Sequence, residues 1–301
     1  MNAEVSVIMG VCDSSNVSYL DRAIYSVLNQ SFQKLEFIVV IDGEVSREIR
    51  ELLYKYQCKD SRITLCFNKT KKGLAYALNK ALSFCTSNLI ARMDDDEICF
   101  PKRLEIQYEI IKRYRFDILF TNFYFIDEND NIISLGYSEK FIKKVRRIIN
   151  HREKFLRKLL SDNFIMHPTV MFRKEKIGNI GGYNSILLSS EDYDLWIRAI
   201  INKLSFGVVD EPLMYIRVPT QQNKQKRIRK QKNYCYWNVC ILKKLEKKLY
   251  HSTQSIREYI LLWVMVKKII LTSHFLQLIP ENILAGITSI RDLVYGYRKM
   301  R

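Results

Sequence analysis

Short runs of apolar and β-branched residues alternate with helical patterns through the first third of the chain. The expected strands are Val5–Val11, Leu35–Asp42, Arg62–Asn68 and Leu89–Asp94. The expected helices are Tyr19–Asn29, Ser46–Tyr56, Leu74–Cys85 and Pro101–Arg113. Such a βαβ series predicts an α/β fold with a mixed, mostly parallel sheet and helices on both faces. Ligands of such sheets bind beyond the carboxyl ends of the strands.

The pattern changes in the second half of the chain. Phe116–Asp127 and Asn131–Leu135 flank a polar turn and predict a strand pair. The helical periodicity of Glu139–Leu160 then predicts one basic helix, whose charged face is typical of a solvated surface. His167–Phe172 is interpreted as a strand, and residues 189–196 as the capped start of a helix.

The composition favours a globular protein, with 48% hydrophobic and 12% aromatic residues in 301. Seven scattered cysteines lack the paired spacing of a zinc site, which indicates a reducing compartment. The N-terminal apolar run is short and has no basic leader, so we expect a first strand and a cytoplasmic protein. Tyr259–Thr272 is the nearest approach to a membrane span, but two lysines interrupt it and it falls short of about 20 apolar residues.

Positive charge is concentrated at the C-terminal end of the chain. The net charge is +17, and residues 224–301 contain 17 basic but only 4 acidic residues. The composition changes at about residue 220, so residues 1–220 are expected to form one domain and residues 221–301 a basic, amphipathic helical tail. Its mixture of apolar, aromatic and basic residues predicts association with an anionic membrane surface. Packing of this tail against residues 1–220 and binding of nucleic acid by a basic arm are the alternatives.

Four consecutive carboxylates, Asp94 to Glu97, end an apolar run just before Pro101. These groups repel one another and cannot be buried unpaired, so a cation among them is expected. A divalent metal that holds a diphosphate is the natural candidate. The alternative is a solvated turn that caps the helix beginning near Pro101.

Six segments, taken in order, resemble one family. They are residues 5–10, residues 19–32, residues 36–43, residues 73–81, residues 92–104 and residues 191–196. Together they are similar to the inverting family 2 glycosyltransferases of the GT-A fold, especially bacterial O-antigen and capsule enzymes. The resemblance covers roughly residues 4–218. Two positions depart from the usual pattern, because Ile41 precedes Asp42 where relatives have two carboxylates, and Cys12-Asp13 replaces a Tyr-Asn pair.

The resemblance implies a nucleotide-sugar site around the acidic cluster. Asp42 matches the position that reads the nucleotide base. Asp96 matches the metal ligand, with Asp94 as a second candidate, and Asp94 or Asp95 would face the ribose and the water shell of the metal. Mn²⁺ or Mg²⁺ suits oxygen ligands and neutralises charge on a departing diphosphate.

The resemblance also implies the residues on the acceptor side. Asp192 matches the base that deprotonates the acceptor, and Glu191 would support it or contact the acceptor, although helix capping also explains both. His167 would line the acceptor site or contact the ligands of the metal, and a structural, hydrogen-bonded histidine is the alternative. Arg217, on an expected strand at Met214–Arg217, lies where relatives cover the diphosphate, although a solvated charge is the alternative.

These inferences predict a metal-dependent enzyme at the cytoplasmic face of the bacterial inner membrane. It would transfer a hexose, galactose being our first choice, from a UDP-sugar to an N-acetylhexosamine on undecaprenyl diphosphate. A capsule or teichoic-type transferase that uses UDP-glucose or a UDP-N-acetylhexosamine is the second interpretation. A nucleic-acid-binding protein is a distant third, because it leaves the acidic cluster unexplained, and no nucleic-acid partner is expected.

Overall fold

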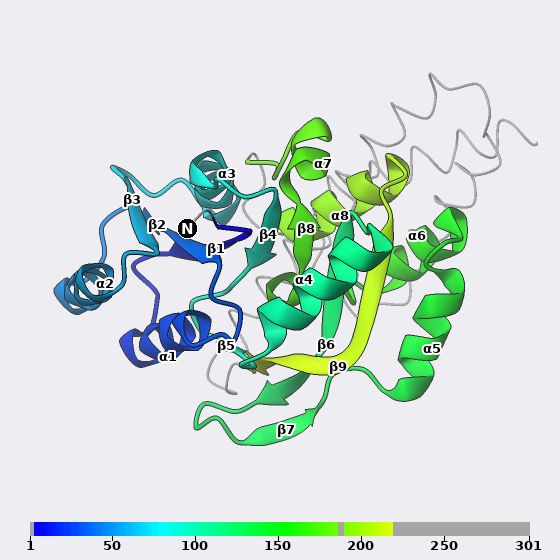
Figure 1. The fold of residues 1–301 in the computed structure, drawn as a ribbon, viewed down its shortest axis with the longest axis horizontal. Helices are drawn as coiled ribbons and strands as arrows, with labels where there is room; N and C mark the ends of the chain where they lie inside the picture. Colours follow the sequence, from blue (N-terminus) through cyan, green and yellow to red (C-terminus); the bar gives the residue numbers. More distant parts are fainter. Residues whose placement is uncertain (1–2, 186–189, 219–301) are drawn as a thin grey trace, which may run out of the picture. The chain divides into compact units, whose positions relative to one another are not determined.

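The computed structural model describes residues 3–185 and 190–218 (Figure 1). The chain divides into two units, Met1–Lys224 and Gln225–Arg301, and the described residues all belong to the first. The predicted basic tail, residues 221–301, therefore lies outside the described residues. Within the described part of the chain, no helix is long and apolar enough to cross a membrane.

The first half of the chain forms four neighbouring parallel strands, in the order β3-β2-β1-β4. They are β1 (Val5–Val11), β2 (Leu35–Asp42), β3 (Ile63–Asn68) and β4 (Leu89–Arg92). Nearly every residue of β1 and β2 is buried, which explains why their sequences are continuous apolar runs rather than alternating ones. The predicted βαβ series is confirmed in this half of the molecule.

Three helices connect these strands. They are α1 (Val17–Leu28), α2 (Arg47–Lys59) and α3 (Leu74–Phe84). Asn16 caps α1 by accepting hydrogen bonds from the backbone N–H groups of Ser18 and Tyr19. Helix α3 packs on β1 and β2, and Figure 1 shows it on the opposite side of these strands from α1 and α2. The sheet is therefore covered on both faces, as the sequence predicts.

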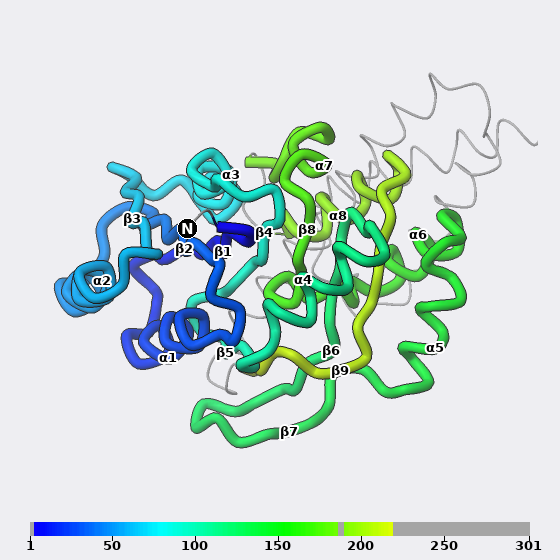
Figure 2. Tube along the Cα trace, viewed as in Figure 1, coloured from blue at the N-terminus to red at the C-terminus, as the bar shows by residue number. Residues whose placement is uncertain are grey.

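The second half extends the sheet with strands of both directions. Its strands are β5 (Ile98–Cys99), β6 (Ile118–Ile126), β7 (Ile132–Leu135), β8 (Met171–Arg173) and β9 (Phe206–Arg217). The order continues from β4 as β8-β6-β9-β5, with β7 beside β6. Strand β8 is antiparallel to β4, and β6 and β9 are parallel (Figure 2). Helix α4 (Arg103–Tyr114) lies against β6 and β9. This is the predicted mixed, mostly parallel sheet.

The helix expected over Glu139–Leu160 is two helices, α5 (Glu139–Ile148) and α6 (Arg152–Ser161). The chain turns at His151, which leaves the helical region at φ −101° and ψ 87°. This turn gives the two apolar faces different partners, because α5 packs on β9 while α6 packs on α8 (Glu191–Ile201). Periodicity alone does not reveal such a turn, since both halves keep the helical spacing.

Two further expectations differ from the structure. The strand expected from His167 starts only at Met171, because His167–Thr169 forms a 3₁₀ turn around Pro168, which lacks an N–H for the sheet. Short helix α7 (Lys174–Asn179) follows β8. The side chain of Ser190 does not cap α8, since Ser190 has a left-handed backbone (φ 63°) and makes no capping hydrogen bond.

Candidate functional site

The acidic cluster lies at the carboxyl end of β4, as the sequence predicts. The backbone N–H of Met93 still donates to the carbonyl of Ile8 (3.0 Å), so the chain leaves the sheet only after this residue. Oxygen atoms of Asp94, Asp95 and Asp96 then lie within 4.8 Å of one another. Asp94 and Asp95 are half-buried and Asp96 is exposed, so the cluster is open on one side.

Two neighbours organise this cluster from the protein side. Arg92, at 1% exposure, forms an ion pair with Asp94. The hydroxyl of Ser15 donates a hydrogen bond to Asp95. Burial raises the pKa of Asp95, the charge of Asp94 raises it further, and the Ser15 hydrogen bond opposes them. Protein contacts therefore fix the side chains of Asp94 and Asp95, whereas a solvated turn would leave them without such contacts.

A second pair of carboxylates, Glu191 and Asp192, begins α8. Burial raises the pKa of Glu191 to about 7, and the negative charges of Asp192 and Asp94 act in the same direction. Burial also raises the pKa of Asp192, while the charge of Arg92 lowers it and that of Asp94 raises it. The fold thus brings the acidic cluster and the α8 pair within electrostatic reach, although about 95 residues separate them in the sequence.

Asp192 is half-buried and is oriented by one amide. Asn163, in the segment between α6 and the 3₁₀ turn, donates from its Nδ2 to Asp192 Oδ2 at 3.1 Å. Such a hydrogen bond fixes the carboxylate without neutralising it. Asp192 therefore combines an oriented oxygen with a raised pKa, the properties expected of a general base.

His167 belongs to the same part of the site and is buried, and its role on the acceptor side stays a prediction. Its Nε2 lies 2.9 Å from the Tyr183 hydroxyl, and its Nδ1 lies 3.9 Å from Glu191 Oε1. Burial and the positive charge of Arg92 lower the pKa of His167 well below its usual value, so the imidazole is neutral. Asn79 clamps the backbone of Tyr183, accepting from its N–H (2.9 Å) and donating to its carbonyl (2.7 Å).

Asp42 is almost fully buried at the end of β2, and its carboxylate organises the loop before α3. It accepts hydrogen bonds from the backbone N–H groups of Lys72 (2.9 Å) and Gly73 (2.7 Å), and from the amide of Asn68 (2.8 Å). Gly73 has φ 94°, a conformation that favours glycine at this turn. These contacts shape the end of the sheet where the nucleotide is predicted, and the base-reading role of Asp42 stays a prediction.

Arg217 is 8% exposed, so the solvated alternative is wrong for this residue. Its guanidinium donates to the carbonyls of Asp96 (3.1 Å) and Asp127 (2.8 Å), and its backbone N–H donates to the buried Glu97 (2.7 Å). Its Cζ also lies 3.9 Å from the ring centre of Tyr19. Arg217 thus connects the acidic cluster to the turn between β6 and β7. Its contact with a diphosphate stays a prediction.

The donor set of the acidic cluster fits a hard divalent cation. Three carboxylates with converging oxygen atoms are ligands that Mg²⁺ and Mn²⁺ prefer over soft donors. The guanidinium of Arg92 pairs with one of these carboxylates, that of Asp94. Within the described residues, Asp94, Asp95 and Asp96 form the one group of three or more such ligands.

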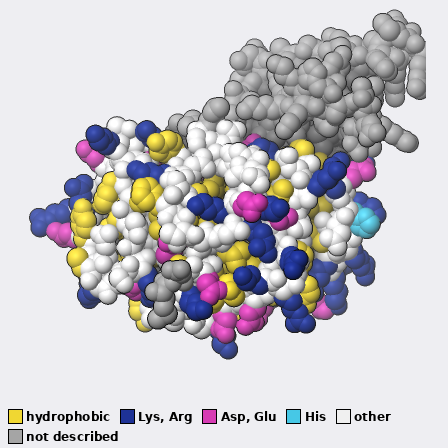
Figure 3. Space-filling view, turned by 45° about the horizontal axis from the view of Figure 1, so that its top comes forward, with side chains coloured by type: hydrophobic (Ala, Val, Ile, Leu, Met, Phe, Trp, Pro, Cys, Tyr) yellow, Lys and Arg dark blue, Asp and Glu magenta, His cyan; other side chains and the backbone are white. Residues whose placement is uncertain are grey.

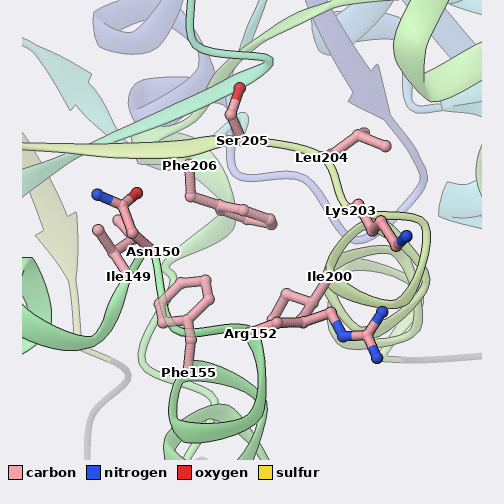
Figure 4. Close-up of a pocket in the computed structure, with 9 residues that line it drawn as sticks. All are labelled: Ile149, Asn150, Arg152, Phe155, Ile200, Lys203, Leu204, Ser205 and Phe206. Carbon is pink, nitrogen blue, oxygen red and sulfur yellow. The ribbon is translucent and has the colours of Figure 1, made fainter.

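A cavity of about 440 Å³ lies elsewhere, where the α5–α6 turn meets the end of α8 and the start of β9 (Figure 4). Phe155, Phe206 and Ile200 form its apolar wall, and Arg152 and Lys203 are its cationic side chains. It contains none of the predicted site residues. Because Phe206 and Arg217 are opposite ends of β9, this cavity is separate from the acidic cluster.

Sequence reasoning missed four residues that organise the site, namely Arg92, Ser15, Asn163 and Asn79. A signal existed for Arg92, since a charged residue follows the apolar run Leu89–Ala91 directly before the acidic cluster. The other three gave no such signal, because each acts through a contact with a residue that is distant in the sequence.

Comparison with known proteins agrees with this geometry. Residues 6–181 match the sequence profile described as Glycosyl transferase family 2. The chain is a family 2 glycosyltransferase. This glycosyltransferase is 35% identical over 237 residues to an uncharacterized glycosyltransferase of Methanocaldococcus jannaschii, which covers 78% of each chain. It is also 35% identical over 201 residues to the O-antigen biosynthesis glycosyltransferase WbnJ of Escherichia coli, covering 65% of this chain and 71% of WbnJ.

Solved structures confirm the GT-A fold of this glycosyltransferase. S. aureus TarS 1–349 in complex with UDP-GlcNAc superposes with a TM-score of 0.62 at 15% identity, covering 91% of this chain and 73% of TarS 1–349. The mannosyltransferase PcManGT from Pyrobaculum calidifontis, in complex with GDP-Man and Mn²⁺, has a TM-score of 0.59 at 13% identity and covers all of this chain and 83% of PcManGT. At these identities the likeness concerns the fold alone.

Proposed function

We propose that this enzyme transfers a hexose from a UDP-sugar to an N-acetylhexosamine on undecaprenyl diphosphate, with inversion at the anomeric carbon. One observation carries the proposal: the open acidic cluster at Asp94–Asp96 and the oriented carboxylate of Asp192 lie within electrostatic reach of one another. An inverting transfer needs these two features, a site for the departing diphosphate and a base for the attacking hydroxyl.

In the proposed reaction, Asp192 takes the proton of the acceptor hydroxyl. The acceptor oxygen then bonds to the anomeric carbon of the sugar while the bond from that carbon to the diphosphate breaks. Asn163 holds the carboxylate of Asp192 in place during this step. Glu191, with its pKa raised to about 7, is partly protonated near neutral pH and can donate a hydrogen bond to the acceptor.

The donor would bind at the acidic cluster. Asp96 and Asp94 would hold Mn²⁺ or Mg²⁺, which when bound supplies positive charge against the departing diphosphate. Asp95 would face the ribose, and Asp42 would read the base at the end of β2. Arg217 would act on the diphosphate through its hold on the Asp96 backbone and through its own charge.

The similarity to WbnJ supports a role in surface polysaccharide assembly, and galactose is our first choice of sugar. A UDP donor is consistent with the UDP-GlcNAc complex of TarS, whose fold this chain shares. A lipid-linked acceptor would place the enzyme at the cytoplasmic face of the bacterial inner membrane. There the basic tail, residues 221–301, would associate with anionic lipid.

A donor panel tests the proposal. UDP-sugars are incubated with a synthetic N-acetylhexosaminyl-diphosphate-lipid and Mn²⁺, with and without a chelator, beside folded Asp96→Ala and Asp192→Ala variants. We expect transfer of one sugar, abolished by the chelator and by both variants. Transfer from UDP-glucose or a UDP-N-acetylhexosamine in place of UDP-galactose would support the capsule or teichoic-type alternative. Undiminished turnover in the variants would contradict the site.

A further inference from the structure

Strand β7 exposes an unusual set of apolar side chains. Ile132, Ile133 and Leu135 are 56%, 57% and 44% exposed. The strand pairs only with β6, so its other edge has no partner within the described sheet. Exposed edge strands are normally protected by charged residues, proline or a covering element. The sequence of β7, Ile-Ile-Ser-Leu, contains neither charge nor proline.

A strongly basic helix follows this strand at once. Only three residues separate β7 from α5, so the end of β7 and the start of α5 lie within about 14 Å of one another. Lys140, Lys144 and Arg147 are exposed on one face of α5, at spacings of four and three residues. No ion pair joins any of these three to an acidic residue in the described part of the chain, whereas Lys143 pairs with Glu139 and Arg146 with Asp210.

The basic surface continues beyond α5. Arg152 and Lys154 at the start of α6 are also exposed, and neither forms an ion pair within the described residues. Figure 3 shows Lys and Arg side chains gathered on the right-hand side of the molecule, where Figure 1 places α5 and α6. Apolar side chains beside clustered cations are the combination by which peripheral proteins bind an anionic lipid surface.

We propose that β7 and the Lys140–Lys144–Arg147 face of α5, here called the docking surface, bind an anionic membrane. Charge decides among the possible occupants. The C-terminal tail carries 17 basic and 4 acidic residues, so it would be repelled, and a second copy of this surface would be repelled for the same reason. Nucleic acid would satisfy the cations, but it offers no apolar phase for Ile132 and Ile133.

The docking surface lies beside the proposed site. The turn that precedes β7 is fixed to α1 and to the acidic cluster, because Asp130 pairs with both Arg22 and Arg217 and the carbonyl of Asp127 accepts from Arg217. Arg217 also donates to the carbonyl of Asp96. A membrane bound at β7 would therefore present a lipid-linked acceptor next to the acidic cluster. The role of this surface in presenting a lipid-linked acceptor rests on the proposed function. Its exposed apolar and basic side chains do not depend on that function.

Vesicle binding of the full chain tests this inference. Vesicles of phosphatidylcholine and phosphatidylglycerol in equal parts are sedimented with wild type, with Lys140→Gln/Lys144→Gln/Arg147→Gln, and with Ile132→Ser/Ile133→Ser. We expect partitioning to fall about 100-fold in the charge variant, at about fivefold per cation. We expect a fall of roughly tenfold in the apolar variant. Wild type should bind pure phosphatidylcholine far more weakly.

The matched control removes three exposed cations from α2, as Arg50→Gln/Lys55→Gln/Lys59→Gln, and should bind as wild type does. Equal loss in this control would overturn the inference, as would full binding by both docking-surface variants or no vesicle binding by wild type. Salt-sensitive binding of duplex DNA that the same substitutions abolish, without vesicle binding, would identify a nucleic-acid surface instead.

A second measurement separates this inference from the proposed function. Transfer to a short-chain, soluble acceptor should be unchanged in both docking-surface variants, whereas transfer to acceptor in vesicles should fall with binding. An equal loss on the soluble acceptor would show that the surface supports the catalytic site and would overturn docking. The vesicle assay contains neither donor nor acceptor, so it remains valid if no transfer is found.

Discussion

The two acidic groups of this glycosyltransferase differ in how far they reach the solvent. The Asp94–Asp96 cluster is open on one side, and its inner carboxylate is paired with a buried arginine. The pair at the start of α8 has no exposed member, since Glu191 is buried and Asp192 is half-buried, and burial raises the pKa values of both, as it raises that of Asp95. A cluster that is open on one side suits a divalent cation that binds together with a diphosphate. Buried carboxylates with raised pKa values suit proton transfer. Environment, rather than residue type, separates the two roles.

The strongest test of this comparison removes one negative charge from the open cluster by replacing a carboxylate with an amide. Asp96→Asn should lower turnover roughly 10⁴-fold, because a bound dication supplies several kcal/mol of charge stabilisation. It should also weaken Mn²⁺ binding measured by calorimetry. Glu109→Gln, an exposed charge on α4, is the matched control and should leave both unchanged. Unaltered Mn²⁺ binding in Asp96→Asn would contradict the metal assignment.

The enclosed pair is tested by removing the base while keeping its shape. Asp192→Asn should lower kcat by about 10³-fold, a typical contribution of a positioned base. Because the site for the donor is untouched, Mn²⁺ binding should stay at the wild-type level. A variant that keeps its kcat, or that loses Mn²⁺ binding as Asp96→Asn does, would show that the two groups do not have separate roles.

The connection between the groups is tested at Arg92. Arg92→Met leaves Asp94 without its buried partner and should lower the free energy of unfolding by about 3–5 kcal/mol. Urea denaturation measures this value. Arg22→Met is the control, since the Arg22–Asp130 pair is partly exposed and should contribute at most about 1 kcal/mol. Equal losses in the two variants would show that burial of Arg92 has no special effect.

The smallest expected effect is a shift in pH dependence. A base must be ionised to act, so kcat/KM should rise with pH as Asp192 loses its proton, at a pKa that burial raises above its usual value. Glu191→Gln removes a neighbouring negative charge, which lowers the pKa of Asp192 and moves this rise to lower pH. A rise that does not move would show that Glu191 has no electrostatic influence on the base.

The fold was predicted largely from local pattern, and its errors have local causes. The apolar runs of β1, β2 and β4 are continuous because both faces of these strands are buried, so they are evident in the sequence. The long strand β9 was recognised only over its last four residues, since Gly207, Asp210 and Pro212 interrupt its apolar pattern. Its partner β6 accommodates these interruptions through irregular register, which no local signal reveals.

The candidate site was likewise predicted only in part from the sequence. The acidic cluster follows a predicted strand, so its place at the carboxyl end of the sheet was predictable. Asn163 and Ser15 were not, because each side chain is useful only through a carboxylate that the fold brings to it. The buried position of Arg217 was likewise hidden, since its contacts come from Tyr19, from Asp96 and Glu97, and from Asp127, which lie in three other segments of the chain.

The sequence by itself determined the βαβ series, the family resemblance and the identity of the carboxylates, because these depend on residue type and local spacing. Only the tertiary structure decided which carboxylates are open and which are enclosed. Only it brought Arg92 within electrostatic reach of both groups. Burial and charge neighbours are sums over residues distant in the chain, and a pKa or an ion pair exists only when the fold has brought those residues together.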